Sequence, residues 1–220
     1  MKLIHSFALK EIIDHNKFTS FLYYLGLLTI KKHIFGNNFV FNVPNEVIAI
    51  MHYDYIRNAL GDSFNLDIDI NFLERAFKDL AFDGEWEPIF KHILDKFYEA
   101  KDLRDFITKE HGIKMFMLAY LNITPLYMIE SEAQLNDGFA DIFFRKNYYI
   151  TDLTNYEYII ELKYLKDQKN ELTKVKNKNK LREDALRQLN RYEKTRHITC
   201  KLKKIIIILS SKGIELMEEV

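Results

Sequence analysis

The sequence predicts an α/β (α+β) protein whose first half is helical and whose second half mixes strands with helices. Three observations support this prediction. Apolar residues recur at helical spacing through most of residues 1–100, short apolar strands follow one another after residue 125, and an Ile-rich run at residues 205–208 is typical of a strand buried on both faces. We therefore expect two domains, residues 1–100 and residues 101–220.

The first half is predicted to contain helices around one pair of strands. A helix over residues 18–28 precedes an alternating strand at residues 39–43, which Pro44 ends. Asn45 is a typical N-cap for the periodic run from Glu46 to Leu60. This order predicts a winged-helix-like unit over about residues 1–60. Amphipathic helices at residues 70–82 and 87–101 follow, with Asp83 and Gly84 between them.

The second half is predicted to begin with a helix over residues 103–121. Asn122 and Pro125 end this helix, because the residue before a proline resists helical geometry. Strands are expected at residues 126–132, 139–144 and 156–165, followed by a charged helix at residues 181–196 and a last strand at residues 203–209. This alternation is the order of an α/β domain.

Composition excludes several classes of protein. An apolar fraction of 48%, with 17 Phe and 13 Tyr among 220 residues, excludes intrinsic disorder. Cys200 is the only cysteine, so the chain has no internal disulfide, and a reducing compartment is expected. The longest apolar run, residues 21–30, is half of the roughly 20 residues that a membrane span needs. We expect a soluble, cytoplasmic protein that does not contact membranes.

The formal net charge of zero hides an uneven distribution. Residues 1–100 carry 10 basic and 14 acidic side chains, whereas residues 101–220 carry 22 and 18. Within residues 166–204 there are 14 basic and 5 acidic side chains. A solvated basic helix face and a patch that binds nucleic-acid phosphates both agree with this excess.

The triplet Glu161-Leu162-Lys163 carries the strongest chemical signal. Residues two apart on a strand project from the same face, so this acid and this lysine lie together. The pattern acid-x-Lys occurs three times, but here alone it closes a strongly apolar strand, where charges need a partner or a metal. An exposed cross-strand ion pair is the alternative for the triplet taken by itself.

Asp141 interrupts another apolar strand, which begins at Gly138. If this strand and the strand of Glu161 are neighbours, two carboxylates and the Lys163 ammonium meet at one edge of a sheet. Carboxylate oxygens suit Mg²⁺ or Mn²⁺, and a bound divalent ion can activate water toward a phosphodiester. The two strands together therefore favour a functional site over a surface ion pair.

Two further polar residues lie on apolar helix faces. Glu110 aligns with Phe106, Ile113 and Met117, and it is a candidate third acid or the partner of Lys114 in a helix ion pair. Gln188 falls in line with Tyr192 on the late helix, where the pair contacts substrate or simply completes core packing.

The order of these residues resembles the PD-(D/E)XK nucleases, and more closely a bacterial group in which the nuclease domain follows an ATPase-like module. Residues 18–29 and 43–47 are similar to the segment that links the two modules in that group. The chain contains no phosphate-binding Gly-Lys-Ser/Thr loop. An ATPase-like partner or a missing N-terminal module is therefore expected, and a homodimer is a further expectation.

The resemblance implies a restriction-endonuclease-like core, a central mixed sheet flanked by helices, and a role for each matching residue. Asp141 and Glu161 would hold the metal, with the Leu162 carbonyl and Glu110 as further ligands. Lys163 would be the catalytic lysine. The remaining matches are the helix glutamine and two weaker positions: Gln188, Tyr192 and Glu132. Many relatives carry Arg just before the motif aspartate, whereas Phe139-Ala140 precede Asp141 here.

Together, the residues and the resemblance predict a Mg²⁺- or Mn²⁺-dependent nuclease that cleaves phosphodiester bonds, with DNA as the expected partner. RNA is permitted by the same chemistry. The alternative is a module that keeps the nuclease fold without cleaving and acts through contacts with nucleic acid or protein.

Overall fold

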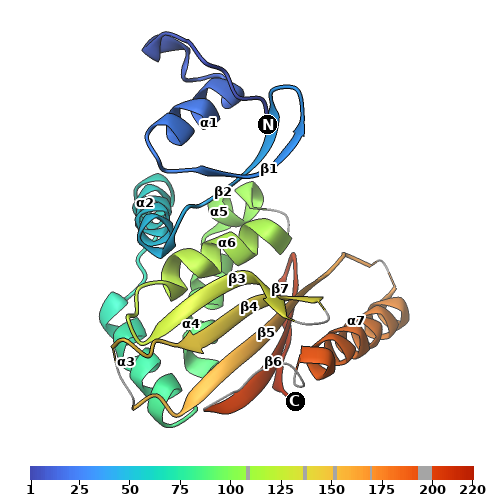
Figure 1. Ribbon diagram of the computed structural model, residues 1–220. Coiled ribbons are helices and arrows are strands. Elements are labelled where there is room, and N and C mark those ends of the chain that lie inside the picture. Colours follow the sequence, from blue (N-terminus) through green and yellow to red (C-terminus); the bar gives the residue numbers. More distant parts are fainter. Residues whose placement is uncertain (108–109, 136–137, 151–152, 169, 193–199) are drawn as a thin grey trace. The chain divides into compact units, whose positions relative to one another are not determined.

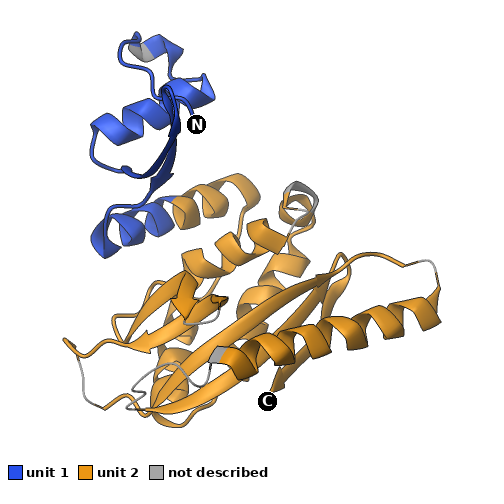
Figure 2. Ribbon diagram, turned by 45° about the vertical axis from the view of Figure 1, so that its right-hand side comes forward, with its two compact units in different colours: residues 1–55 blue, residues 56–220 orange. Residues whose placement is uncertain are grey.

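The computed structural model describes residues 1–107, 110–135, 138–150, 153–168, 170–192 and 200–220. These residues form two compact units, residues 1–55 and 56–220 (Figure 2). Helix α2 (Glu46–Phe64) contributes residues to both units. Among the described residues, no helix is both long and apolar enough to cross a lipid bilayer.

The first unit is built around a hairpin. A short 3-10 helix, η1 (Leu9–Glu11), precedes α1 (His15–Tyr24), and β1 (Thr29–Phe35) and β2 (Asn38–Asn42) then pair antiparallel. Gly36 in the hairpin turn has φ 55°, a left-handed conformation that glycine adopts without steric cost. Asn45 caps α2, because its Oδ1 accepts a hydrogen bond from the Ile48 N–H at 3.0 Å. The element order is the one predicted, and the winged-helix assignment stays a prediction.

A mixed sheet of five strands forms the centre of the described part of the second unit (Figure 1). Its order is β3 (Tyr127–Leu135), β4 (Gly138–Lys146), β5 (Tyr156–Leu165), β6 (Lys201–Ser210) and β7 (Gly213–Glu219). β5 and β6 run parallel, and the other neighbours run antiparallel. A parallel pair needs a long crossover, which here contains α7 (Glu171–Tyr192). The residues 205–208 are fully buried, which confirms that β6 is covered on both faces.

Helices cover both faces of this sheet (Figure 1). On one face, Ala185 and Leu189 of α7 are fully buried in a cluster with Ile159 and Ile206. On the other face lie α3 (Ile70–Phe82), α4 (Glu87–Glu99) and α6 (Glu110–Leu121). The Phe90 ring of α4 packs 5.9 Å from that of Phe144 in β4. The sequence prediction of an α/β fold with a central mixed sheet flanked by helices is confirmed.

The structure matches the predicted bounds of α3 and β5 and corrects three other elements. The predicted helix over residues 103–121 is two helices, α5 (Lys101–Phe106) and α6, because Ile107 has an extended backbone, with φ −102° and ψ 90°. Ile107 and Thr108 are both β-branched, and such residues favour a helix only weakly. Thr108 and Lys109 themselves lie outside the described residues.

The late helix begins earlier than predicted, and one strand was not predicted at all. α7 starts at Glu171 instead of Leu181. The prediction missed the first ten residues because they lack apolar periodicity, but Lys, Glu and Leu among them are good helix formers. The predicted end at Arg196 lies outside the described residues. β7 is short and half-exposed, and it forms by pairing antiparallel with β6.

Helices α3 and α4 belong to the same compact unit as the sheet. The Tyr158 hydroxyl of β5 donates a hydrogen bond to the Leu80 carbonyl of α3 at 2.6 Å, and the Tyr98 hydroxyl of α4 donates one to the Ser210 carbonyl of β6 at 2.8 Å. The contacts thus divide the chain between residues 55 and 56. The boundary near residue 100 concerns the extent of the nuclease-like domain, and it stays a prediction.

Candidate active site

Three carboxylates lie in a row across neighbouring strands. β3 and β4 pair in a register that sets Glu132 opposite Asp141. The register of β4 with β5 runs up to the pair Ile142 and Ile160, and the next position brings Asp141 beside Glu161. The structure therefore brings together the two acids that the sequence pattern singled out, and it adds Glu132 to them.

Asp141 interrupts the backbone ladder between β4 and β5. Its Oδ2 accepts a hydrogen bond from the Leu162 N–H at 3.0 Å, and its Oδ1 lies 3.4 Å from the Lys114 ammonium. The side chain keeps an exposed fraction of only 19%. These contacts hold the carboxylate in one orientation, and each oxygen retains a lone pair for a further ligand.

Glu161 is the most deeply buried acid of the row. The residue is 1% exposed, and its Oε2 accepts a hydrogen bond from the Lys163 ammonium at 3.0 Å. Its Oε1 is buried and has no hydrogen-bond partner in the described part of the chain. A buried carboxylate oxygen without a donor or a cation raises the free energy of the folded state. A bound cation would satisfy this oxygen, and so would a proton shared with Asp141.

Glu110 is placed differently from the prediction. It is the first residue of α6, not a position inside a longer helix, and it is exposed rather than buried. It nevertheless lies close to the site, because its carboxyl group accepts a hydrogen bond from the Tyr164 backbone N–H and interacts with Asp141 and Lys163. Partial burial and the charge of Asp141 raise the pKa of Glu110, while Lys163 opposes them.

Lys114 is a site residue that the sequence reasoning considered only as a partner for Glu110. It is 5% exposed, and its ammonium forms ion pairs with Glu132 and Asp141 instead. Burial alone would lower the pKa of Lys114, but the hydrogen bond to Glu132 and the charge of Asp141 outweigh it, so the pKa is raised. The sequence contained a signal for this role. Lys114 lies within the apolar run of α6, where a charged side chain needs a partner.

Glu132 has an unusual backbone conformation. Its φ of 55° falls in the left-handed region, which non-glycine residues seldom adopt within a strand. The side chain is 62% exposed, yet it reaches the Lys114 ammonium. Backbone strain of this kind costs about 1–3 kcal/mol and tends to occur at functional sites.

A groove beside Lys163 faces α7. Gln188 lines this hollow of about 480 Å³ together with Lys163, Arg187 and Arg191. The structure thus brings Gln188 to the same place as the motif lysine. Tyr192 is the last residue of α7, and its side chain lies outside the described part of the structure.

The donor set suits a divalent metal held by few protein ligands. Within the described ranges, no group of three or more His, Cys, Asp and Glu side chains is placed to hold a metal ion. Mg²⁺ is commonly bound by one or two carboxylates plus water and substrate phosphate, which matches Asp141, Glu161 and its unpaired oxygen. Glu110 as a third ligand and the Leu162 carbonyl as a fourth stay predictions.

The net charge around the row of three carboxylates matches the charge of one divalent ion. When ionised, the site has four carboxylates, Glu110, Glu132, Asp141 and Glu161, and it has two ammonium groups. The balance is two negative charges, which one divalent cation would neutralise. Burial, and then the neighbouring charge of Asp141, raise the pKa of Glu161 to about 7, although Lys163 opposes this change.

In metal-free protein, we expect the stability of the folded chain to fall as the pH rises from about 4.5 to about 7. The ordinary pKa of Glu161 is 4.5 and the folded-state pKa is about 7, so the folded protein holds a proton that the unfolded chain has lost. The loss is about 3 kcal/mol at most. Urea unfolding in EDTA at pH 5 and pH 7.5 measures it.

Glu161→Gln should flatten this pH dependence, because an amide does not ionise. Glu99→Gln is the matched control, since Glu99 is exposed at the end of α4 and pairs only with Lys96 among the described residues. An unchanged pH dependence in Glu161→Gln would show that burial of this carboxylate is not the cause.

Comparison with known proteins agrees with this geometry. A family model for the PD-(D/E)XK nuclease superfamily matches residues 108–219, which is half of the chain. The matched segment contains α6, the five strands of the sheet and α7, and hence the acids and lysines of the candidate site: Glu110, Lys114, Glu132, Asp141, Glu161 and Lys163. A comparison with curated proteins gave no match. The match over half of the chain, together with the mixed sheet that brings Asp141 to Glu161 and Lys163, shows that the chain belongs to the PD-(D/E)XK nuclease superfamily.

Proposed function

We propose that this protein is a divalent-metal-dependent nuclease that hydrolyses phosphodiester bonds in DNA. One observation carries the proposal. Asp141 and Glu161 meet on neighbouring strands, Lys163 bonds to Glu161 at 3.0 Å, and a buried Glu161 oxygen has no hydrogen-bond partner among the residues that the structure describes. Membership of a nuclease superfamily supports the same reading.

Asp141 and Glu161 would hold the metal, with Mg²⁺ or Mn²⁺ as the ions their oxygens suit. When bound, the ion would supply activated water and neutralise charge that develops on the phosphate. The Leu162 N–H keeps Asp141 in position, since it bonds to Oδ2 at 3.0 Å. The Leu162 carbonyl is a proposed additional ligand.

Lys163 would orient the attacking water and stabilise negative charge on the phosphate. Its side chain is 18% exposed, so it can reach a substrate while Glu161 fixes its position. Glu110 interacts with Lys163 and lies beside Asp141, and burial together with the charge of Asp141 raises its pKa, so its carboxyl group is a proposed proton carrier for the attacking water. In the overall reaction, the water oxygen bonds to phosphorus, one phosphorus–oxygen ester bond breaks, and the leaving oxygen takes up a proton.

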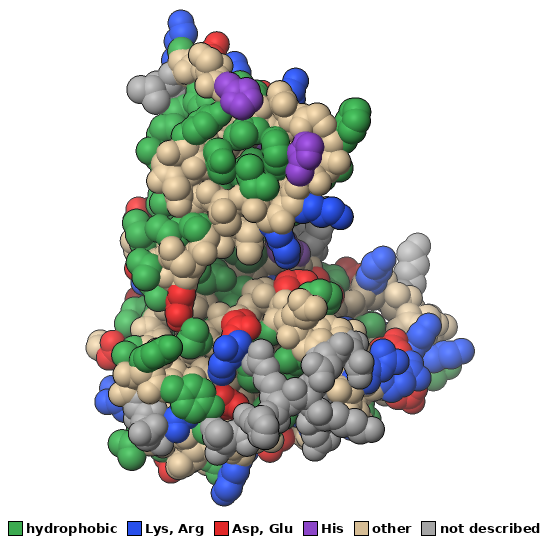
Figure 3. Space-filling view, viewed as in Figure 1, with side chains coloured by type: hydrophobic (Ala, Val, Ile, Leu, Met, Phe, Trp, Pro, Cys, Tyr) green, Lys and Arg blue, Asp and Glu red, His purple; other side chains and the backbone are tan. Residues whose placement is uncertain are grey.

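The groove beside Lys163 would hold the nucleic-acid backbone. α7 carries seven Lys and Arg residues and three Asp and Glu residues, and Figure 3 shows basic side chains gathered over this helix. Arg191 lines the groove with Lys163 and Gln188. Contacts of this kind bind phosphates without reading sequence. They support nucleic acid as the partner and do not distinguish DNA from RNA.

The decisive experiment is a cleavage assay on plasmid DNA, linear duplex DNA and single-stranded RNA, each with Mg²⁺, with Mn²⁺ and with EDTA. We expect cleavage of DNA with either ion and none in EDTA, because the carboxylates alone cannot activate water. Cleavage that persists in EDTA, or RNA cleaved in place of DNA, would contradict the proposal. Circular and linear substrates compared in the same assay separate endonuclease from exonuclease activity.

A binding module without cleavage is the second candidate, and the Lys114 ion pair favours it. The Lys114 ammonium lies 3.4 Å from Asp141 Oδ1, so the charge of this carboxylate is balanced without a metal ion. The same assay decides, because such a module would retain DNA in a mobility shift and leave it intact with both ions. A cytoplasmic location, a homodimer and an ATPase-like partner module stay predictions.

A further inference from the structure

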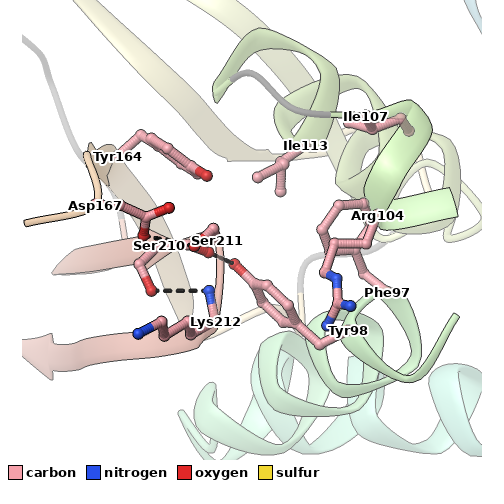
Figure 4. Close-up of a pocket in the computed structure, with 10 residues that line it drawn as sticks. All are labelled: Phe97, Tyr98, Arg104, Ile107, Ile113, Tyr164, Asp167, Ser210, Ser211 and Lys212. Atoms are coloured by element: carbon pink, nitrogen blue, oxygen red, sulfur yellow. Dashed lines mark hydrogen bonds between the residues drawn. The ribbon is translucent and has the colours of Figure 1, made fainter. Parts of the chain in front are cut away.

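A second cavity lies across β5 from the groove. Lys163 faces α7, and Tyr164 projects to the opposite face, because neighbouring strand residues alternate. The cavity has a volume of about 660 Å³, within the range of pockets that hold small molecules. Figure 4 shows side chains from α4, α5 and the β6–β7 turn around it. None of these residues has a role in the proposed cleavage.

Arg104 of α5 is a cation that lines the cavity. It is partly buried, and no hydrogen bond or ion pair joins its guanidinium to a side chain that the structure describes. Its charge acts on Tyr98, beside which it lies in Figure 4. A guanidinium withdrawn from water in this way is stabilised by an anion, and it matches the geometry of a phosphate.

The other side of the cavity offers a hydrogen-bond acceptor. Asp167 lies opposite Arg104 (Figure 4), and its Oδ1 accepts a hydrogen bond from the Ser211 hydroxyl at 2.6 Å. The carboxylate would repel a phosphate and accept from an amino group. The rings of Tyr98 and Tyr164 lie between these two ends, and aromatic rings are the surfaces on which nucleic-acid bases stack.

We propose that this cavity binds one unpaired nucleotide of the substrate strand, with its phosphate at Arg104 and the amino edge of its base at Asp167. The inference rests on the proposed function. Tyr164 follows Lys163 directly, and its N–H bonds to Glu110, so the cavity wall is continuous with the candidate active site. A nucleotide held there would therefore be a near neighbour of the bond that is cleaved.

The orientation makes a specific prediction about the base. Cytosine carries an amino group where thymine carries a carbonyl oxygen, and only the amino group can donate to Asp167. Thymine also carries a C5-methyl group, whereas uracil lacks it and differs from cytosine only along this hydrogen-bonding edge. We therefore expect dCMP to bind about tenfold more tightly than dUMP, as a hydrogen bond to a charged group would produce.

The first arm of the test is calorimetric titration of the full chain in EDTA with dCMP, dUMP and deoxycytidine. Arg104→Gln should abolish the preference for dCMP over deoxycytidine, because the phosphate loses its cation. Arg75→Gln is the matched control, since Arg75 is exposed on α3 and lines a different surface. If dCMP fails to bind, or binds equally to Arg104→Gln, the inference is wrong whether or not the protein cleaves DNA.

The second arm identifies the source of the nucleotide. A labelled single-stranded oligonucleotide is titrated in EDTA at several salt concentrations. Arg104→Gln should bind about tenfold more weakly, and its salt dependence should fall by about 0.7 in slope, the amount for one lost phosphate contact on a single strand. Unchanged strand binding with lost dCMP binding would assign the cavity to a free nucleotide and overturn the proposal. Positive results in both arms without cleavage would reject the proposed function and leave this binding site.

Discussion

Asp141→Asn is expected to reduce metal-dependent cleavage of DNA by roughly 10³-fold or more, because the substitution removes one carboxylate from the proposed metal site. The amide oxygen can still accept from the Leu162 N–H, which bonds to Asp141 Oδ2 at 3.0 Å, so the strands should keep their arrangement. The increase in Tm that Mg²⁺ or Mn²⁺ produces should disappear as well. Initial cleavage rates and thermal unfolding with and without the ion measure both effects.

Lys163→Met separates chemistry from metal binding. This variant should lose cleavage to a similar degree but keep a metal-induced rise in Tm, because the lysine bonds to Glu161 and is not a ligand. Lys203→Met and Asp79→Asn are matched controls, since Lys203 pairs with Glu219 and Asp79 is exposed on α3. Equal cleavage by wild type, Asp141→Asn and Lys163→Met would remove the basis for the proposed nuclease.

Lys114→Met is expected to destabilise the metal-free protein by about 2 kcal/mol. Breaking a buried ion pair costs about 3–5 kcal/mol, and the 62% exposure of Glu132 reduces that cost. For a chain of this size the loss corresponds to a fall in Tm of about 6 °C. The variant should also gain more stability from Mg²⁺ than wild type does, because the carboxylates then lack one of their two cations.

The control for this prediction is an ion pair of the same type at the surface. Lys96→Met removes the pair with Glu99 on α4, where the side chains are 35% and 65% exposed, and should cost less than about 0.5 kcal/mol. Adding Glu132→Gln to Lys114→Met should recover part of the loss. If Lys114→Met and Lys96→Met had the same Tm and the same response to Mg²⁺, the ion pairs of Lys114 would contribute no more to stability than a surface ion pair does.

The local parts of the candidate site could be predicted from the sequence. Glu161 and Lys163 lie two apart on a strand, and the alternation of strand residues places both on one side whatever the rest of the chain does. Asp141 stood out for a similar reason, as an acid in an apolar strand. The bounds of α3 and β5 were predictable because an amphipathic helix carries a clear period and a buried strand appears as a short apolar run.

Contacts between distant segments could not be predicted from the hydrophobic periodicity of the sequence. The extended backbone at Ile107 ends α5, so Glu110 begins α6 instead of lying inside one longer helix. In the sequence, two β-branched residues near this position are too weak a signal to predict that the helix ends there. β7 forms because β6 offers it an edge, and its own pattern is too weak to predict a strand. The first turns of α7 carry no apolar stripe, so propensity and not burial extends the helix there.

The sequence by itself determined the fold class, the family resemblance and the two acids and lysine of the motif, because these depend on residue type and short spacing. The tertiary structure alone decided that Lys114 pairs with Glu132 and Asp141 and that Arg104 faces a cavity. It also decided that one Glu161 oxygen is buried with no hydrogen-bond partner in the described part of the chain. These features depend on strand register and helix packing across many residues of chain, and a charged side chain reveals its partner only when both are placed in space.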